Sequence, residues 1–239
     1  MSRPFISVVT PTYNRARFIP SMVACYKSQT YPKDRMEWII LDDGTEKVGD
    51  LVASLTKDLP NIRYISLDEK QNIGAKRNRL NREAKGEYII SMDDDDFYSP
   101  ERVSHAVTKL KAMPSIDLAG SSELYMYYTD TGDIYKLGPF GSKHATNGTM
   151  VYTSRYAKQH LYDETVTHAE EKSFLDDYKH PMIQLDPMKT MLVMSHSENT
   201  FDKTQFRQSL DTNPFIKKTQ LKLRNFIKDM PLRDFFSSL

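Results

Sequence analysis

YIISMDDDD, residues 88–96, joins an apolar run typical of a buried strand to four consecutive carboxylates. Neighbouring carboxylates repel each other, by about 1 kcal/mol per close pair in water and several times more near a protein surface. The cluster therefore needs either full solvation or a cation, and hard divalent ions such as Mg²⁺ prefer a few carboxylates together with phosphate oxygens. Because the carboxylates close a predicted strand and precede residues 97–100, we favour metal binding over a solvated acidic turn.

Strand-like apolar runs alternate with helical patterns on both sides of this stretch, up to about residue 120. The alternation predicts an α/β fold with a mostly parallel central sheet and helices on both faces. Ligands of such sheets bind beyond the carboxyl ends of the strands, where Asp42-Asp43 and the four aspartates fall. The predicted strands cover 5–10, 38–41, 62–67 and 88–92, and the predicted helices lie around 19–26, 48–57, 75–84 and from Ser99 onward.

The pattern changes after residue 120. A glycine-rich stretch at 138–148 is expected to be mobile, and the chain looks helical and basic from about Lys203. Further predicted elements are a hairpin with strands at 124–128 and 134–137, a helix near 169–178 and a strand at 191–194. We expect one domain over residues 1–200, with halves 1–120 and 121–200, and a C-terminal helical extension over 201–239.

Composition excludes several classes of protein. A net charge of +1 gives no global field that would gather nucleic acid or an acidic membrane. The single cysteine, Cys25, excludes an internal disulfide and a cysteine-based zinc site. The N-terminus lacks the apolar run of a signal peptide, and no stretch approaches the roughly 20 apolar residues that cross a bilayer. We therefore expect a cytoplasmic protein, at most attached to a membrane surface.

Two further motifs suit a nucleotide. NIGAKRN, residues 72–78, opens a predicted helix with a glycine and two cations, a combination that suits phosphate. We expect Lys76, Arg79 and Arg82 on a solvated face, while Arg77 could lie there or at a ligand. Asp42-Asp43-Gly44 could contact a base or ribose, or cap the next helix. The chain has neither G-x-G-x-x-G after its first strand nor a P-loop, which disfavours a Rossmann dinucleotide site and P-loop phosphate transfer.

Four motifs in order resemble those of the GT-A fold, family 2 inverting glycosyltransferases. They are FISVVTPTYNR at 5–15, IILDDG at 39–44, NIGAKRN at 72–78 and GEYIISMDDDD at 86–96. The resemblance is specific over roughly the first 115 residues and looser beyond. It implies a nucleotide-diphosphate sugar donor bound by the first half, a glycan or other hydroxyl acceptor on the second half, and a divalent metal, Mn²⁺ or Mg²⁺. UDP is the commonest nucleotide of the family's donors.

The resemblance also implies roles for individual residues. Asp43 would contact the base or ribose, and Arg77 would lie near the nucleotide pocket. Asp93 and Asp95 would form the D-x-D pair, with Asp95 as the direct metal ligand, Asp93 facing the donor, and Asp94 between them counted with the nucleotide-binding residues. The pocket itself would be walled by Pro11, Thr12, Tyr13 and Arg15.

The catalytic base of the family is usually the aspartate of a Glu-Asp pair that begins a helix. The corresponding pair here is Glu170-Glu171, a departure that makes the side chain of the expected base one carbon longer. Helical spacing places Glu171 on the face of Phe174, Leu175 and Tyr178, and Glu170 off that face. Partial desolvation would raise the pKa of Glu171, as a general base needs. The alternative is that both acids only complement the helix dipole.

Two features near the C-terminus complete the set. His196, after the predicted strand 191–194, resembles a late histidine that completes the metal site of some GT-A enzymes, although a structural hydrogen-bonding role is the alternative. The basic C-terminal helix is expected to pack against the domain or a second subunit rather than lie on a membrane. Its expected apolar side consists of Ile216, Leu223, Phe226, Ile227 and Met230.

With these roles we expect a direct displacement of the nucleotide diphosphate by the acceptor. Glu171 would take a proton from the acceptor hydroxyl, and the 138–148 stretch would close as a lid over the donor. A sugar nucleotidyltransferase is a weaker interpretation, because such enzymes carry a glycine-rich loop after the first strand. A non-catalytic module that binds sugar nucleotides or glycans is the alternative outside enzymes. Asn147-Gly148-Thr149 matches a glycosylation acceptor pattern, to which we give no meaning in a chain expected to be cytoplasmic.

Overall fold

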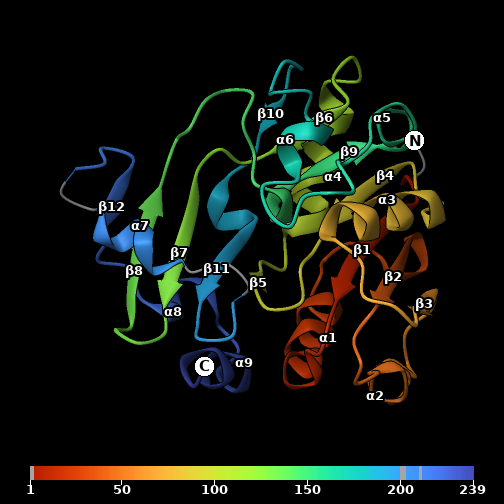
Figure 1. The fold of residues 1–239 in the computed structure, drawn as a ribbon, viewed down its shortest axis with the longest axis horizontal. Helices are drawn as coiled ribbons and strands as arrows, with labels where there is room; N and C mark the ends of the chain where they lie inside the picture. Colours follow the sequence, from red (N-terminus) through yellow and green to blue (C-terminus); the bar gives the residue numbers. More distant parts are fainter. Residues whose placement is uncertain (1–2, 200–202, 210–211) are drawn as a thin grey trace.

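The computed structural model describes residues 3–199, 203–209 and 212–239 of the chain. These residues form a central sheet and a smaller second sheet beside it (Figure 1). The central sheet has the strand order β10-β6-β9-β4-β1-β2-β3. Its strands are β1 (Ile6–Thr12), β2 (Met36–Asp42), β3 (Ile62–Ser66), β4 (Tyr88–Ser91), β6 (Leu118–Gly120), β9 (Val151–Thr153) and β10 (Ile183–Gln184).

The central sheet is mostly parallel, as predicted. Strand β1 pairs in parallel with β2 and β4, and β2 pairs in parallel with β3, whereas β9 runs antiparallel to β4 and β6. The first four predicted strands are confirmed, with ends that differ by one or two residues. In the register of the sheet Thr12 lies opposite Asp42, so that β1 and β2 end side by side.

Side chains that alternate along these strands build two cores, one on each face of the sheet. Val8, Trp38 and Ile90 belong to one core, while their neighbours Val9 and Ile39 belong to the other. The first core is covered by α1 (Ile19–Lys27), α2 (Gly49–Leu55) and α4 (Arg102–Ala112), and the second by α3 (Ile73–Glu83), α5 (Ser154–Gln159) and α6 (Glu171–Phe174). The expected fold class, with helices on both faces, is therefore confirmed.

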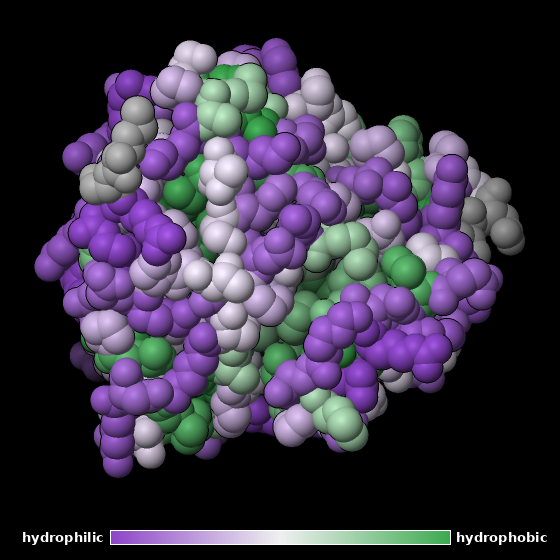
Figure 2. All heavy atoms as spheres, turned by 180° about the vertical axis from the view of Figure 1, so that it is seen from behind, coloured by the Kyte–Doolittle hydropathy of each residue, from purple (hydrophilic) through white to green (hydrophobic). Residues whose placement is uncertain are grey.

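The second sheet was not predicted. Its strand order is β12-β8-β7-β11-β5, and the predicted hairpin supplies β7 (Leu124–Tyr128) and β8 (Asp133–Leu137). The remaining strands are β5 (Phe97–Tyr98), β11 (Met191–Ser195) and β12 (Ile216–Lys218). Strand β5 follows the aspartate run directly and pairs with β11, so the run lies where the two sheets meet. From behind, hydrophilic residues cover most of the surface, with hydrophobic residues visible between them (Figure 2).

The C-terminal region packs against the domain, as we favoured, but the single amphipathic helix that we expected is wrong. The described residues instead form α7 (Thr204–Gln208), β12, α8 (Leu223–Phe226) and α9 (Met230–Ser237). Ile216 lies in β12, which pairs with β8, and Met230 is 62% exposed instead of facing the core. Helix α9 packs through Phe235, whose ring lies edge-on to Phe18 at 6.0 Å. The expected boundary at 200/201 falls outside the described residues.

Two other segments of the second half differ in length or order from expectation. Helix α6 is a single turn, because Asp176, Asp177 and Tyr178 all have positive φ and end the helix early. The 138–148 stretch bridges the two sheets from β8 to β9, and its last residues form a buried 3₁₀ turn at Asn147–Thr149. That this stretch moves stays a prediction. Within the described ranges, none of the helices combines the length and apolar content needed to cross a bilayer.

Replacing Gly74 by alanine is expected to destabilise the protein. A Cβ at this first-turn position of α3 would lie 2.0 Å from the backbone oxygen of Asp163, which belongs to the segment that leads to α6. Overpacking of this kind costs about 1–3 kcal/mol. Thermal denaturation of Gly74→Ala should show a melting temperature lower by several degrees. An unchanged melting temperature would mean that the segment around Asp163 moves aside without cost.

Candidate active site

The carboxyl ends of β1, β2 and β4 carry the residues that the sequence motifs single out. Asp43 follows β2 and is 2% exposed. Its two carboxylate oxygens accept hydrogen bonds from Lys76 Nζ at 2.7 Å and from the backbone N–H of Gln71 at 2.8 Å. Lys76 also donates to the backbone oxygen of Thr12 at 3.2 Å, so it ties α3 to both strands. Our placement of Lys76 on a solvated face is therefore wrong, whereas Arg79 and Arg82 do lie at the surface.

The residues after β1 line the same edge. Pro11 and Thr12 are buried within the strand, and Tyr13 is partly exposed with Lys70 Nζ 4.3 Å from its ring centre. Arg15 is 14% exposed in its side chain and lies between Asp95, at 3.8 Å, and Glu198, at 3.7 Å. This edge therefore offers an accessible aromatic ring, on which a base can stack, and two cations, which suit the phosphates of a nucleotide.

The four aspartates of the run have four different surroundings. Asp93 faces Arg77, and Asp95 faces Arg15 and His196. Asp94 is buried, and burial together with the charge of Asp95 raises its pKa to about 7. Asp96 accepts a hydrogen bond from the backbone N–H of Met194 at 2.7 Å, which ties the run to β11.

Arg77 joins four separate elements. From α3 its Nε donates to Glu170 at 2.7 Å and its Nη1 donates to Asp93 at 3.1 Å. With the Asn147 amide turned so that its oxygen faces the guanidinium, that oxygen accepts from Nη1 at 2.7 Å and the amide nitrogen donates to the Tyr162 hydroxyl. Burial alone would lower the pKa of Arg77, but Asp93 and Glu170 raise it well above its usual value. The cation is therefore fixed between the aspartate run and the glutamate pair.

The glutamate pair is arranged differently from expectation. We expected Glu170 to lie off the inward face, and this is wrong: it is 7% exposed and pairs with Arg77. The reason is that Glu170 precedes the short helix, at its N-cap, and so does not follow the helical spacing. Glu171 is partly buried as expected, and burial, followed by the charge of Glu170, raises its pKa to about 7. Among the ion pairs of the described residues Glu170 is paired and Glu171 is not. The carboxyl group of Glu171 is therefore suited to accept a proton near neutral pH.

We expected Asp95, Asp93 and His196 as metal ligands, and the structure brings only Asp95 and His196 together. His196 Nε2 lies 3.4 Å from Asp95 Oδ2, while Asp93 is engaged by Arg77. Across residues 3–199, 203–209 and 212–239, no three His, Cys, Asp or Glu side chains form a group that could hold a metal. A carboxylate and an imidazole nevertheless fit a cation that takes its other ligands from a bound diphosphate, as Mg²⁺ commonly does.

The surroundings of Asp95 and His196 add a condition to that fit. The backbone N–H of Glu198 donates to His196 Nδ1 at 3.2 Å, and the Asn199 amide nitrogen lies 2.9 Å from His196 Nε2, so both ring nitrogens face donors. Asn199 Nδ2 also donates to Asp95, at 3.3 Å. Although burial opposes ionisation, His196, Lys203 and Arg15 hold the pKa of Asp95 well below its usual range. Asp95 is thus an anion already, and a cation on His196 Nε2 would have to displace the Asn199 amide.

Several residues of this site were not predicted as site residues. Asn147, Tyr162 and Asn199 lie outside the four motifs, and Lys76 lies within the third but was expected on a solvated face. Asn147 stood in a pattern that we had set aside as a glycosylation acceptor, yet it is buried against Arg77. Only the fold shows that the turn before β9 reaches the end of β4.

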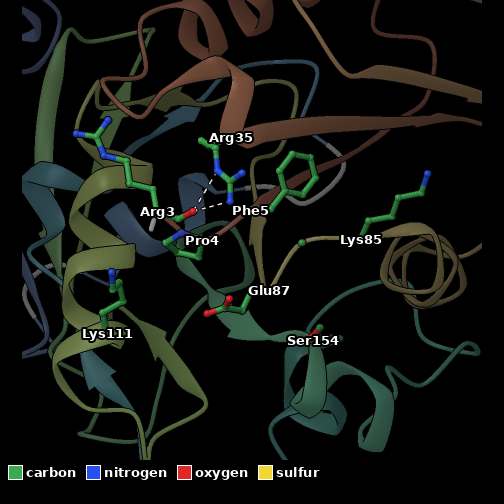
Figure 3. Close-up of a pocket in the computed structure, with 9 residues that line it drawn as sticks. Arg3, Pro4, Phe5, Arg35, Lys85, Glu87, Lys111 and Ser154 are labelled. Atoms are coloured by element: carbon green, nitrogen blue, oxygen red, sulfur yellow. Dashed lines mark hydrogen bonds between the residues drawn. The ribbon is translucent and has the colours of Figure 1, made fainter. Parts of the chain in front are cut away.

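A cavity of about 390 Å³ lies at the opposite edge of the central sheet (Figure 3). Phe5 and Glu87 line it just before β1 and β4 begin, so it opens at the amino ends of the strands. Arg35 reaches into it and donates to the backbone oxygen of Arg3 at 2.6 Å. Ligands of parallel sheets bind at the carboxyl ends, so we place the functional site at the aspartate run and not here.

Comparison with known proteins identifies similar chains and similar folds. An uncharacterised glycosyltransferase of Methanocaldococcus jannaschii is 27% identical over 205 residues, which cover 77% of this chain and 69% of the relative. Two solved structures show the same fold. The mannosyltransferase PcManGT from Pyrobaculum calidifontis, in complex with GDP-Man and Mn²⁺, has a TM-score of 0.68 at 15% identity over 88% of this chain and 62% of that one. Staphylococcus aureus TarS 1-349, in complex with UDP-GlcNAc, has a TM-score of 0.63 at 18% identity over 82% and 60%.

The chain spans less than two thirds of those solved structures and about 40% of two further relatives. A family model described as "Glycosyl transferase family 2" matches residues 7–168, which include the aspartate run and the end of β9. The expected GT-A fold is confirmed by the structural likenesses. The chain belongs to glycosyl transferase family 2.

Proposed function

We propose that the chain is an inverting glycosyltransferase that moves a sugar from a nucleotide-diphosphate donor to a hydroxyl group of a glycan or other acceptor. The observation that carries the proposal is the ion-pair chain Asp93–Arg77–Glu170, which joins the end of β4 to the start of α6. It brings the aspartate run and the glutamate pair into one site at the carboxyl edge of the sheet. We assign the donor to residues 1–120 and the acceptor to residues 121–200.

The donor's nucleotide is proposed to lie along the edge formed by Pro11, Thr12, Tyr13 and Asp43. The partly exposed Tyr13 ring supplies a face on which a base can stack, and Asp43 is held rigidly by Lys76. UDP is our first choice of nucleotide. Support for the donor class comes from similar structures, one of which holds UDP-GlcNAc and another GDP-Man.

The diphosphate is proposed to lie beside Asp95, where Arg15 approaches to 3.8 Å. Asp95 and His196 would hold a divalent cation there, Mn²⁺ or Mg²⁺, and such a cation neutralises the charge that develops on the leaving diphosphate. The Mn²⁺ in the PcManGT complex supports this choice of cofactor.

Glu171 is proposed as the general base, with Glu170 as its positioning partner through Arg77. Glu171 takes the proton of the acceptor hydroxyl, and the oxygen forms a bond to the anomeric carbon. The bond from that carbon to the diphosphate oxygen breaks, and its electron pair leaves with the nucleotide diphosphate. A single displacement from the opposite face inverts the anomeric configuration. Arg77 donates a hydrogen bond to Glu170, so that Glu171 remains the carboxylate free to accept the proton.

A screen of UDP- and GDP-linked sugars with Mn²⁺, Mg²⁺ or EDTA tests the proposal. We expect release of nucleotide diphosphate that EDTA abolishes, and proton NMR of the product should show the opposite anomeric configuration to the donor. Formation of a nucleoside triphosphate and a sugar 1-phosphate when pyrophosphate is added to the sugar nucleotide would instead identify a nucleotidyltransferase. Donor binding without any turnover would identify a non-catalytic module.

Replacing His196 by alanine is expected to weaken the metal dependence. Loss of one of two protein ligands should raise the Mn²⁺ concentration for half-maximal activity by roughly 10- to 100-fold. His105→Ala is a matched control, because His105 is a partly buried histidine on α4 that accepts from the backbone N–H of Asp186. If His196→Ala leaves the metal titration unchanged and lowers only the melting temperature, His196 is structural.

A further inference from the structure

Four aromatic rings form a continuous row on the second half of the chain. We call them the aromatic row: Phe215, Phe140, His144 and Tyr178. Ring centres lie 5.8 Å apart from Phe215 to Phe140, 5.2 Å from Phe140 to His144, and 4.9 Å from His144 to Tyr178. The row joins three segments that are far apart in sequence, since Phe215 precedes β12, Phe140 and His144 belong to the bridge between the sheets, and Tyr178 follows α6.

The outer end of the row is exposed. Phe140 is 39% and Phe215 47% exposed, although apolar rings of this size are normally buried. Contiguous exposed apolar groups mark binding surfaces more often than isolated ones do. The two adjacent exposed phenylalanines therefore indicate a binding surface.

The inner end of the row leads to the proposed base. Tyr178 lies in the turn that follows α6, and the backbone of this region is tied back to α6 by the hydrogen bond from Leu175 N to Glu171 O at 2.9 Å. Tyr178 packs against the core that holds Phe174 and Leu175. Glu171 is the first residue of that same helix. The row therefore ends beside the helix that carries the proposed base.

The backbone under the row is held in place. The Gln184 amide nitrogen donates to the backbone oxygens of Ser142 and His144 at 3.0 and 3.2 Å. The backbone N–H of Phe140 donates to Ser122, and Gly138 N donates to Phe215 O at 2.8 Å. A surface fixed in this way loses little conformational entropy when a ligand binds.

The chemistry of the row selects a neutral ligand with flat apolar faces. Burial lowers the pKa of His144, so its imidazole is neutral at pH 7 and the row carries no charge of its own. The face of an aromatic ring is electron-rich and attracts the weakly positive C–H groups on the face of a pyranose. Hydroxyl groups around the edge of the sugar remain free to bind water or neighbouring polar groups.

We propose that the aromatic row is the acceptor subsite, on which one or more pyranose rings of a saccharide acceptor stack while the terminal hydroxyl reaches Glu171. This inference rests on the proposed function and makes it more specific, because it names a saccharide and not an apolar carrier as the group that the second half recognises. The two exposed rings, Phe140 and Phe215, lie side by side and suit an acceptor of more than one sugar.

Binding of saccharide probes to the full chain tests the proposal directly. Saturation-transfer NMR would use methyl β-D-glucoside, the tetrasaccharides of glucose, N-acetylglucosamine and mannose, and octyl β-D-glucoside. We expect saturation of ring C–H protons of at least one tetrasaccharide. We also expect its loss in the Phe140→Leu/Phe215→Leu double variant, which keeps apolar bulk but removes the aromatic faces. Phe140→Tyr/Phe215→Tyr should restore it, and Met113→Ala, which alters an exposed apolar side chain at the end of α4, should leave it unchanged.

Three outcomes would overturn the proposal. The first is saccharide binding that the double leucine variant leaves intact. The second is binding that requires the octyl chain, which would assign the row to an apolar group. The third is no saturation transfer to any saccharide. Melting temperatures of the variants show whether a loss reflects unfolding, and the tyrosine variant separates loss of the ring from loss of the fold.

Kinetics separate this inference from the function on which it rests. With a donor that is turned over, the double leucine variant should raise the KM for the saccharide acceptor about tenfold. The KM for the donor and the slow release of nucleotide diphosphate to water should stay unchanged. An unchanged KM for the acceptor in the double leucine variant would contradict the acceptor subsite alone. If the unaltered protein turned over no donor at all, the proposed function itself would be wrong.

Discussion

Replacing Glu171 by glutamine is expected to lower the rate of sugar transfer by about 100- to 10,000-fold, the range that a general base contributes. The amide keeps the size of the side chain but cannot accept the hydroxyl proton. Glu171→Asp should retain part of the activity, because the family's usual base is an aspartate. Steady-state release of nucleotide diphosphate measures the effect. Asp177→Asn, which removes an exposed carboxylate three residues beyond the end of α6, is the matched control and should change little.

The pH dependence gives a second check on Glu171. A base must be ionised to work, so the rate should rise with pH through about 7 and level off above it, following the raised pKa. The same shift acts on stability: the folded protein holds the Glu171 proton at pH values where the unfolded chain has lost it. The contribution of Glu171 to stability should therefore fall between its ordinary pKa and about 7. Glu171→Gln should remove that fall, as urea unfolding at pH 5 and pH 8 would measure. Full activity of Glu171→Gln would contradict the assignment.

Replacing Arg77 by alanine is expected to lower the free energy of unfolding by about 3–5 kcal/mol. The substitution leaves the carboxylate of Glu170, which is 9% exposed in its side chain, buried without its cation. It also releases Asp93 and the amide of Asn147. Because the ion-pair chain positions the glutamate pair, sugar transfer should be lost as well. Urea unfolding and donor turnover on the same preparation measure both effects.

Two variants separate the structural and functional parts of that loss. Arg79→Ala is the matched control, since Arg79 lies on the same helix, is 45% exposed and pairs only with Glu83 in the ion pairs of the described residues. It should change the free energy of unfolding by less than about 1 kcal/mol. The double variant Arg77→Met/Glu170→Met removes both buried charges and should recover stability without recovering transfer. Recovery of transfer as well would mean that Arg77 acts only on folding.

The first half of the fold could be predicted because its signals are local. Runs such as residues 38–41 are apolar on both faces, since both faces of the parallel sheet are covered, and turn residues separate them from the helices. The positions of Asp43 and Asp93 at one edge follow from the rule that parallel strands end together. The structure places both there, although their roles in binding remain proposals.

The remainder could not be predicted because it depends on long-range pairing. Strand β5 has two residues and β12 three, too short for any periodicity, and they exist because β11 and β8 offer edges to pair with. Lys76 looked like part of a solvated face, but the ends of β1 and β2 bury it. Glu170 was assigned by helical spacing, whereas the helix begins one residue later and the charge of Arg77 decides its direction.

An alanine scan of residues 93–96 would return four different phenotypes from four chemically identical side chains. Loss of Asp96 would free the backbone of β11 and appear as poor folding, while loss of Asp93 would leave Arg77 with only part of its counter-charge. Loss of Asp95 would appear as altered cation demand, and loss of Asp94 as a disturbed packing beneath the strand end. Counting acidic residues in the run therefore says little about how any one substitution would behave, because each position reports on a different neighbour.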